Sequence, residues 1–129
     1  MIRVLHLDTN HHSLVDGLAA LGMENVHNTS STKEEIEQII GDYHGIVLRS
    51  RFPIDKTFLA RAKKLKFVAR VGSGLENIDV AAAAELGVRV LSAPEGNSPA
   101  VGEHALGMLL SLLNKLPKAN QEVKSHTKW

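Results

Sequence analysis

The stretch GIVLRSR, residues 45–51, decides the fold class of this chain. Its first four residues are apolar without alternation, which is typical of a strand buried on both faces at the centre of a parallel sheet. Similar short runs recur on both sides of it, separated by stretches with helix-capping residues. Parallel strands require such crossover segments. The pattern therefore predicts an α/β fold with a doubly wound parallel sheet.

Five strands are expected, and right-handed crossovers arrange them most simply in the flavodoxin-like order 2-1-3-4-5. The expected strands are 2–7, 24–27, 45–48, 67–70 and 88–91. Helices are expected to begin at the N-caps Ser13, Asp55 and Asp79. A further helix is expected to begin with a capping box formed by Ser31 and Glu34.

The C-terminal part of the chain predicts a long helix with Ser98 as its N-cap and Pro99 in its first turn, able to run past Leu116. Residues 105–113 carry no charge, and apolar side chains occupy most of the helix circumference, so most of it must be buried. The sheet domain can cover only one side. We expect the other side to contact a second subunit or a domain outside these residues; a tight fold that buries the helix internally is the alternative.

Composition narrows the function classes. The 129 residues can bury one core, and a formal net charge of +1 gives no general attraction to nucleic acid or membranes. The absence of cysteine excludes disulfides, thiolate metal sites and a cysteine nucleophile, in agreement with a reducing compartment. The apolar run at the N-terminus is too short for a signal peptide, so a cytoplasmic location is expected.

The strand ends predict a site for a small anion. In open α/β sheets, ligands bind at the carboxyl ends of the strands. Arg49 and Arg70 follow the third and fourth strands, which are neighbours in the expected order, and guanidinium groups bind carboxylates or phosphates. Gly72 and Gly74 would let backbone N–H groups approach the same anion.

Two nucleotide motifs are incomplete. Asn77 stands where the third glycine of a dinucleotide fingerprint is required. Gly102 and Gly107 have the spacing of a phosphate-binding P-loop, but Met108 stands where its lysine is required. We therefore expect an anion loop and no complete nucleotide site.

The histidines do not predict a metal site. His6, His11 and His12 lie near the end of the first strand with only Asp8 as a further ligand, so solvated loop histidines are expected. Glu103 and its neighbour His104 diverge around the helix and are expected to serve packing or an interface.

Several segments together resemble the D-isomer-specific 2-hydroxyacid dehydrogenases in order and spacing. They are LRS at 48–50, AKKLK at 62–66, RVGSGLENID at 70–79 and APEGNS at 93–98, followed by EH at 103–104. The resemblance covers most of the chain after about Gly45 and implies a flavodoxin-like substrate domain, residues 1–97. It also implies that residues 98–129 form a helix, used for homodimerisation, that leads to an NAD-binding domain.

The resemblance also implies roles for five residues. Ser73 and Gly74 would donate backbone N–H groups to the carboxylate of a small-molecule substrate, with Ser73 also near the cofactor. Arg49 and Arg70 would face a substrate phosphate. Asn97 would lie at the hinge between the domains.

The catalytic apparatus of the family lies elsewhere. Its dinucleotide motif and its catalytic arginine, glutamate and histidine follow a tryptophan that resembles Trp129. No catalytic residue is therefore expected in this chain, NAD would be bound mainly by another domain, and the chain alone is expected to be inactive.

Three alternatives remain. A related dehydrogenase acting on glycerate, lactate or glyoxylate stays open, because only the arginine pair favours phosphate. A receiver-like regulatory domain is disfavoured by Arg49, which stands where a phosphoacceptor aspartate is required. An FMN electron carrier is disfavoured because residues 8–12, DTNHH, make a poor phosphate loop.

Overall fold

A computed structural model describes residues 1–125 and contains a five-stranded sheet followed by two helices. The strands are β1 (Arg3–His6), β2 (Glu24–His27), β3 (Gly45–Leu48), β4 (Phe67–Arg70) and β5 (Arg89–Leu91). The α-helices are α1 (His12–Ala20), α2 (Lys33–Ile39), α3 (Lys56–Arg61), α4 (Val80–Glu85), α5 (Ser98–Leu113) and α6 (Leu116–Lys124). Two short 3-10 helices are η1 (Ile40–Asp42) and η2 (Pro94–Gly96).

The predicted sheet order is confirmed. The strands lie in the order β2-β1-β3-β4-β5, and all neighbours are parallel. In the centre, Ile46 of β3 pairs with Leu5 of β1 and Val68 of β4. All four residues of β3 are buried, as the unbroken apolar run GIVL predicted. The fold is thus flavodoxin-like, with the carboxyl ends of all strands at one edge.

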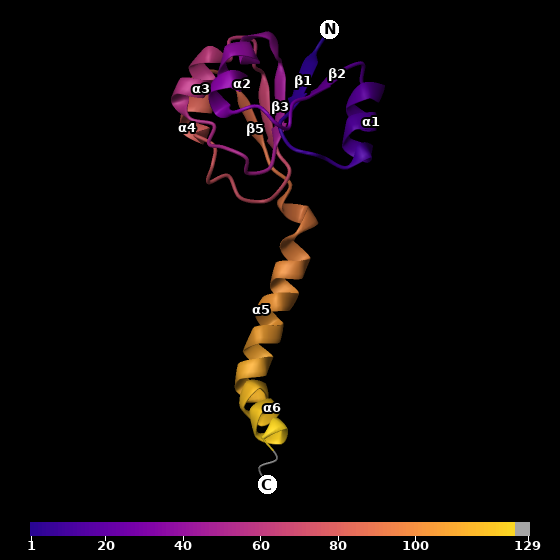
Figure 1. Cartoon of the computed structure of the whole chain (residues 1–129), viewed down its shortest axis with the longest axis vertical. Coiled ribbons are helices and arrows are strands. Elements are labelled where there is room, and N and C mark those ends of the chain that lie inside the picture. The colour runs from indigo at the N-terminus through magenta and orange to yellow at the C-terminus, as the bar shows by residue number, and fades with distance from the viewer. Residues whose placement is uncertain (126–129) are drawn as a thin grey trace. The chain divides into compact units, whose positions relative to one another are not determined.

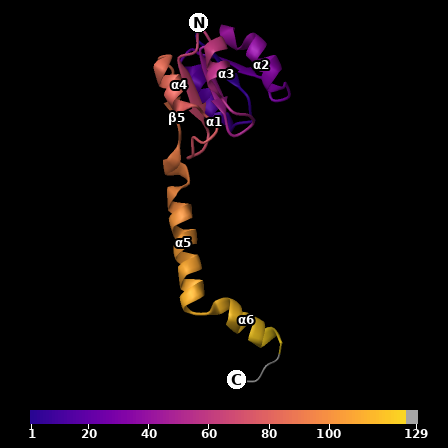
Figure 2. The same cartoon turned by 90° about the vertical axis from the view of Figure 1, so that its left-hand side faces the viewer.

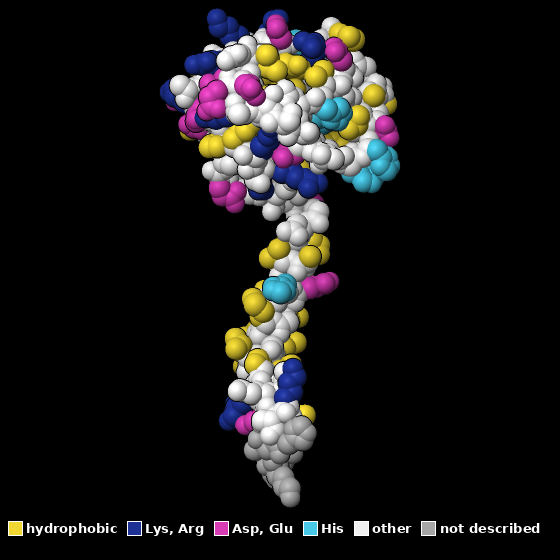
Figure 3. Space-filling model, in the orientation of Figure 1, with side chains coloured by type: hydrophobic (Ala, Val, Ile, Leu, Met, Phe, Trp, Pro, Cys, Tyr) yellow, Lys and Arg dark blue, Asp and Glu magenta, His cyan; other side chains and the backbone are white. Residues whose placement is uncertain are grey.

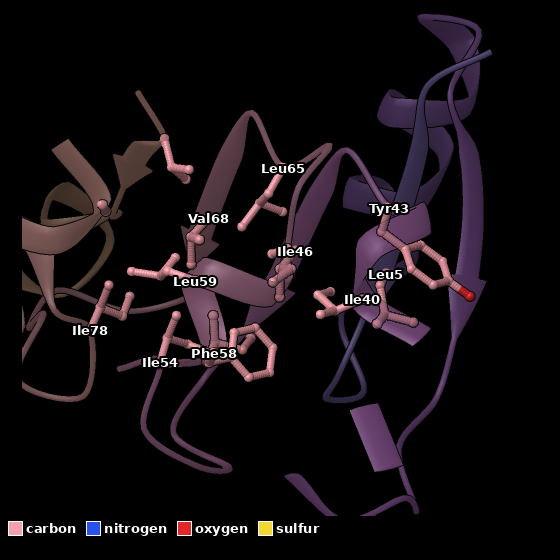
Figure 4. Close-up of a cluster of buried hydrophobic side chains, with 14 of the residues drawn as sticks. Leu5, Ile40, Tyr43, Ile46, Ile54, Phe58, Leu59, Leu65, Val68 and Ile78 are labelled. Carbon is pink, nitrogen blue, oxygen red and sulfur yellow. The ribbon is translucent and has the colours of Figure 1, made fainter. Parts of the chain in front are cut away.

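Helices cover the sheet unequally. Within the sheet domain, α2, α3 and α4 lie on one face and α1 lies on the other (Figure 1). The main core lies under the three helices, where Phe58 of α3 is fully buried in a cluster that includes Ile46 of β3 and Val68 of β4 (Figure 4). On the opposite face, the ring of Phe67 lies against Gly45, so that a Cβ on this glycine would be 2.7 Å from Cε2 of the ring.

Two of the predicted helix caps are confirmed. The carboxylate of Asp55 accepts a hydrogen bond from Phe58 N, and that of Asp79 accepts one from Ala82 N, both at 2.9 Å. Asp55 also forms an ion pair with Lys33 of α2. Its hydrogen bonds, above all the one from Lys33, hold the pKa of the Asp55 carboxyl well below its usual range.

Two other caps in the sheet domain were predicted one or two residues away from their actual positions. Helix α1 is capped by His11, whose side chain accepts from Ser13 N, so Ser13 lies inside the helix. The capping box of α2 uses Thr32 and Glu35 in place of Ser31 and Glu34. The reason is a local hydrogen bond, because Ser31 N donates to the Asn28 side chain three residues earlier and Ser31 is thereby fixed in the preceding turn.

The chain divides into two compact units, Met1–Pro94 and Glu95–Trp129. In the second unit, Pro99 lies in the first turn of α5 as predicted, but the N-cap is Asn97 rather than Ser98. A single helix running past Leu116 is also wrong, because α5 ends at Leu113 and α6 follows it (Figure 2).

The break between α5 and α6 has a local cause. Lys115 adopts a left-handed conformation with φ 53°. Pro117 follows in the first turn of α6, and inside a continuous helix it would lack an N–H and would clash with the carbonyl group of Leu113. Trp129 lies outside the described residues.

Helix α5 exposes its apolar side chains. Taken by itself, its unit buries none of the α5 residues, and yellow apolar side chains follow one another along it (Figure 3). The exposed apolar side chains are Val101, Leu106, Met108, Leu109, Leu110, Leu112 and Leu113. Among the helices described up to residue 125, none is long and apolar enough to span a membrane.

Candidate anion-binding site

The backbone of Arg49, directly after β3, is hydrogen-bonded to side chains that follow β1 and to side chains at and after the end of β4. Its backbone N–H donates to Oδ2 of Asp8, beyond β1, at 2.6 Å. Its carbonyl oxygen accepts from Nε of Arg70 at 3.1 Å and from Nδ2 of Asn77, in the loop after β4, at 3.4 Å. The Arg49 side chain itself is exposed. Neighbouring side chains therefore hold the backbone of Arg49 and leave its guanidinium group to the solvent.

Arg70 lies beside Arg49, as the strand order predicted. In the β3–β4 register, Arg70 is paired with Leu48, directly before Arg49. A Cβ on Gly72 would be 2.8 Å from Nη1 of Arg70, so the guanidinium group occupies the space that a side chain would fill. Among the ion pairs of residues 1–125, none involves Arg49 or Arg70. Two positive charges thus meet at this edge without a paired carboxylate.

The loop after β4 adds backbone donors. Its beginning is anchored, because Gly72 N donates to Arg70 O at 3.0 Å and Gly72 O accepts from Ala93 N at 2.9 Å. The next two N–H groups, of Ser73 and Gly74, donate to no acceptor in the described part of the chain. We call Arg49, Arg70 and residues 72–77 the anion mouth. Unpaired N–H groups beside guanidinium groups suit a small carboxylate or phosphate.

Two carboxylates border the anion mouth. Asp8 is committed to the backbone of Arg49. The exposed carboxylate of Glu76 lies in the space that a Cβ on Gly74 would take. Its negative charge opposes the binding of an anion to the neighbouring N–H groups. Neither Glu76 nor Asn77 was assigned to the site from sequence, although both lie in the glycine loop.

Arg51 has a different role from its neighbour Arg49. Its Nη1 donates to Leu7 O at 2.8 Å and to Asn28 O at 2.7 Å, and its Nη2 donates to Ser31 O. These carbonyl groups follow β1, follow β2 and precede α2. Arg51 therefore fastens its own loop, after β3, to the β1–α1 loop and the β2–α2 loop at the carboxyl edge of the sheet. Sequence offered no sign of this, because two arginines at one strand end look alike.

A hollow of about 370 Å³ adjoins the anion mouth on the face that carries α1. Arg70 and Asn10 contribute polar groups to its wall, and Ala69, Val71 and Leu91 contribute apolar ones. Val71 and Leu91 are 37% and 42% exposed, because α1 covers only part of this face.

The histidine prediction is wrong for His6. This side chain is fully buried within β1, is stacked on His27 of β2 and is hydrogen-bonded to Asn25 and Asn10. It is not a solvated loop residue. Burial lowers the pKa of His6; the hydrogen bond to Asn25 opposes this effect, and the charge of His27 adds to it.

His11 and His12 are exposed, as expected, with His11 serving as the cap of α1. Within residues 1–125, no three His, Asp or Glu side chains form a group that could hold a metal ion.

The described residues do not fit a dinucleotide. Asn77 replaces the third glycine, and α4 has six residues. The Asp79 carboxylate already accepts from Ala82 N at the N-terminus of α4, where a pyrophosphate would have to lie. Asn97, an exposed residue, belongs to the second unit.

Comparison with known proteins agrees with this geometry. The family model for the D-isomer specific 2-hydroxyacid dehydrogenase, catalytic domain, matches residues 4–128. The chain belongs to this dehydrogenase family. D-3-phosphoglycerate dehydrogenase of Archaeoglobus fulgidus is 34% identical over 128 residues, covering 99% of the chain and 24% of that protein. The same enzyme of Synechocystis sp. is 36% identical over 129 residues, covering 100% and 23%.

Solved structures show the same fold. The PH0520 protein of Pyrococcus horikoshii OT3 has a TM-score of 0.90 at 23% identity, over 98% of this chain and 38% of that one. NAD+-bound 3-phosphoglycerate dehydrogenase of Entamoeba histolytica has a TM-score of 0.68 at 26% identity, over 85% and 38%. The chain spans about a quarter of the length of the two curated relatives named above.

Proposed function

We propose that this chain is the substrate-binding part of an NAD-dependent D-2-hydroxyacid dehydrogenase that oxidises 3-phosphoglycerate to 3-phosphohydroxypyruvate, a step of serine biosynthesis. The observation that carries the proposal is the anion mouth. Two guanidinium groups without carboxylate partners adjoin two unpaired backbone N–H groups, in a family whose substrates carry a carboxylate. A phosphorylated 2-hydroxy acid has two anionic groups for these two sets of donors.

Each set of donors has a role in this proposal. Ser73 and Gly74 bind the substrate carboxylate through their backbone N–H groups, which are the shorter and less mobile donors. Arg49 and Arg70 bind the phosphate, whose oxygens suit planar guanidinium groups. None of these residues is catalytic; they orient the substrate.

NAD, which supplies the hydride chemistry of such enzymes, needs another domain. Since the described residues form no dinucleotide cradle, we place NAD mainly on another domain of the enzyme. Residues 1–97 are then the substrate-binding domain, and residues 98–129 connect the two. Ser73 lies near the cofactor, and Asn97 lies at the hinge.

The proposal is tested by titrating the ¹⁵N-labelled 129-residue chain with 3-phosphoglycerate, D-glycerate and inorganic phosphate. We expect 3-phosphoglycerate to shift the amide signals of Ser73 and Gly74 and to bind more tightly than D-glycerate. Arg70→Gln should weaken its binding by roughly tenfold or more, as for loss of a charged hydrogen bond. The control is Arg89→Gln, an exposed arginine at the opposite end of a strand.

Three results would each overturn part of the assignment. Unchanged affinity in Arg70→Gln would remove the phosphate role. Equal affinity for D-glycerate and 3-phosphoglycerate would favour a related dehydrogenase with an unphosphorylated substrate. If no ligand shifts any amide of the anion mouth, the binding site itself is wrong.

We further propose that the protein forms a homodimer through α5. The leucine side chains of α5 are largely exposed: 48–69% for Leu106, Leu110 and Leu113, and 72% for Leu112. Exposed apolar side chains contiguous along a helix are typical of an interface. A second copy related by a twofold axis would bring the same apolar surface against this one.

Sedimentation velocity tests the dimer with a matched pair of variants. Leu112→Glu should shift the protein to a monomer, because it buries a charge in the interface. Leu21→Glu, at the C-cap of α1, where the leucine is 73% exposed, should leave the dimer intact. A monomeric wild type at about 100 μM, well above the dissociation constants of stable dimers, would refute the proposal.

A further inference from the structure

The buried His6 side chain is hydrogen-bonded to strand β2 and to the loop between β1 and α1. One ring nitrogen, Nε2, lies 2.7 Å from Oδ1 of Asn25 in β2. The other, Nδ1, lies 3.1 Å from Nδ2 of Asn10, in the loop between β1 and α1. Both nitrogens of a fully buried imidazole are thus engaged.

The neighbouring groups determine the tautomer of His6. The amide nitrogen of Asn25 donates to the carbonyl oxygen of Val15 in α1, at 3.2 Å. Its Oδ1 therefore faces His6 as an acceptor, and Nε2 must carry the proton. Consequently Nδ1 is an acceptor, which agrees with the Asn10 amide nitrogen beside it. Asn10 Nδ2 also donates to Asp8 O at 2.9 Å.

These contacts form a continuous connection from the core to the anion mouth. His6 holds the Asn10 amide, which holds the Asp8 backbone, and the Asp8 carboxylate accepts from the N–H of Arg49. We propose that His6, acting through Asn10 and Asp8, is a positioning residue for Arg49, and that its protonation releases the β1–α1 loop and makes the anion mouth sensitive to pH.

Protonation forces a rearrangement because Nδ1 changes from acceptor to donor. The Asn10 amide would then have to turn its oxygen toward Nδ1. That oxygen, Oδ1, is buried and accepts no hydrogen bond from any described residue, so it is available. The turn directs it at Asp8 O as well, and the hydrogen bond that fastens Asp8 is lost. The β1–α1 loop is therefore held in one arrangement when His6 is neutral and is released when His6 is charged.

The surroundings of His6 favour the neutral form. From β2 the stacked ring of His27 faces it, at a centroid distance of 4.7 Å, and a charge there repels a second one. From β3 its register partner is Val47, and α1 presents the carbonyl group of Val15 to its partner Asn25. Beyond β1, the carboxylate of Asp8 is committed to Arg49. The hollow that Asn10 borders is also lined by His11 and Arg70.

Burial accordingly lowers the pKa of His6 from its ordinary value of 6.5. The neutral, fastened arrangement is present at neutral pH. This arrangement is lost as the pH falls below 6.5, the ordinary pKa of histidine, and passes the lowered pKa of His6.

The test follows the histidine rings and the Arg49 amide by NMR on the full chain between pH 7.5 and 5. Long-range ¹H–¹⁵N spectra should show the Nε2–H tautomer for His6 and a titration midpoint below 6.5. The Arg49 amide signal should shift with the same midpoint. A merely structural histidine would show the tautomer without moving Arg49.

Variants separate His6 from its neighbours. In His6→Gln the pH-dependent shift of the Arg49 amide should disappear, whereas in His27→Gln it should persist. Should His6→Gln fail to fold, Asn10→Ala tests the same connection. In this variant His6 would still titrate, but the Arg49 amide signal would no longer shift with the same midpoint. An Nδ1–H tautomer, or an Arg49 shift that remains in Asn10→Ala, would overturn the inference.

The effect on ligand binding rests on the proposed function and is measured separately. The loss of 3-phosphoglycerate affinity between pH 7.5 and 5.5 should be several-fold greater in the wild type than in His6→Gln, a comparison that cancels titration of the ligand. Equal losses in the two proteins would overturn the link to binding. Absence of binding at every pH would refute the proposed function, while the NMR result would still decide the role of His6.

Discussion

Arg49 and Arg51 are two residues apart, yet the structure predicts opposite consequences of replacing them. Arg51→Ala removes a charged donor from the carbonyl oxygens of Leu7, Asn28 and Ser31. Arg49→Ala removes a side chain that makes no hydrogen bond or ion pair within residues 1–125, while the backbone contacts that hold Arg49 remain.

The size of the Arg51 effect follows from these contacts. A hydrogen bond to a charged group contributes about 1.5–3 kcal/mol, but partly exposed carbonyl groups regain some of this from water. About 1 kcal/mol for each of the three gives roughly 3 kcal/mol for Arg51→Ala. Arg49→Ala should change the free energy of unfolding by less than about 0.5 kcal/mol, as exposed substitutions usually do.

Urea unfolding measures this difference. The near-UV circular dichroism of Tyr43, the single tyrosine and a buried core residue, reports the sheet domain. With a urea dependence of about 1.5 kcal/mol per M, Arg51→Ala should lower the midpoint by roughly 2 M. Arg49→Ala should leave the midpoint unchanged and weaken 3-phosphoglycerate binding. Equal midpoints for the two variants would refute the distinction between a fastening and a binding arginine.

Further predictions concern charge, capping and packing. Glu76→Gln should tighten 3-phosphoglycerate binding roughly threefold at low salt and not in 1 M salt, since an exposed charge is screened; titrations at both salt concentrations check this. Asp55→Ala should lower stability by about 1 kcal/mol at pH 7. Because the hydrogen bond from Lys33 lowers the pKa of Asp55 in the folded state, this difference should shrink as the pH falls below 3.8, the unfolded value; urea midpoints across pH show it. Gly45→Ala should destabilise by about 1–3 kcal/mol by displacing the aromatic ring packed on it, whereas Gly17→Ala, with free space around it, should be neutral or stabilising by up to about 1 kcal/mol; melting temperatures distinguish the two.

Several expectations failed where two neighbouring residues could serve one purpose. Ser31 and Thr32 can each cap a helix, and Asn28 decides between them by binding Ser31 N.

The error at His6 had a detectable sign, because this residue lies within the strand expected at 2–7 and two residues after Val4, on the same face. A polar residue at a buried strand position requires partners, and Asn25 and Asn10 provide them.

The sequence by itself determined the strands, their order and hence the adjacency of Arg49 and Arg70. Unbroken apolar runs mark buried parallel strands, and crossover handedness restricts their order, so both are local or general properties. Only the tertiary structure decided that Arg51 fastens loops while Arg49 stays available, and that His6 is buried. The partners of Arg51 lie 20 to 44 residues away and are backbone carbonyl groups. Since every residue has a carbonyl group, no residue type in the sequence could have identified them.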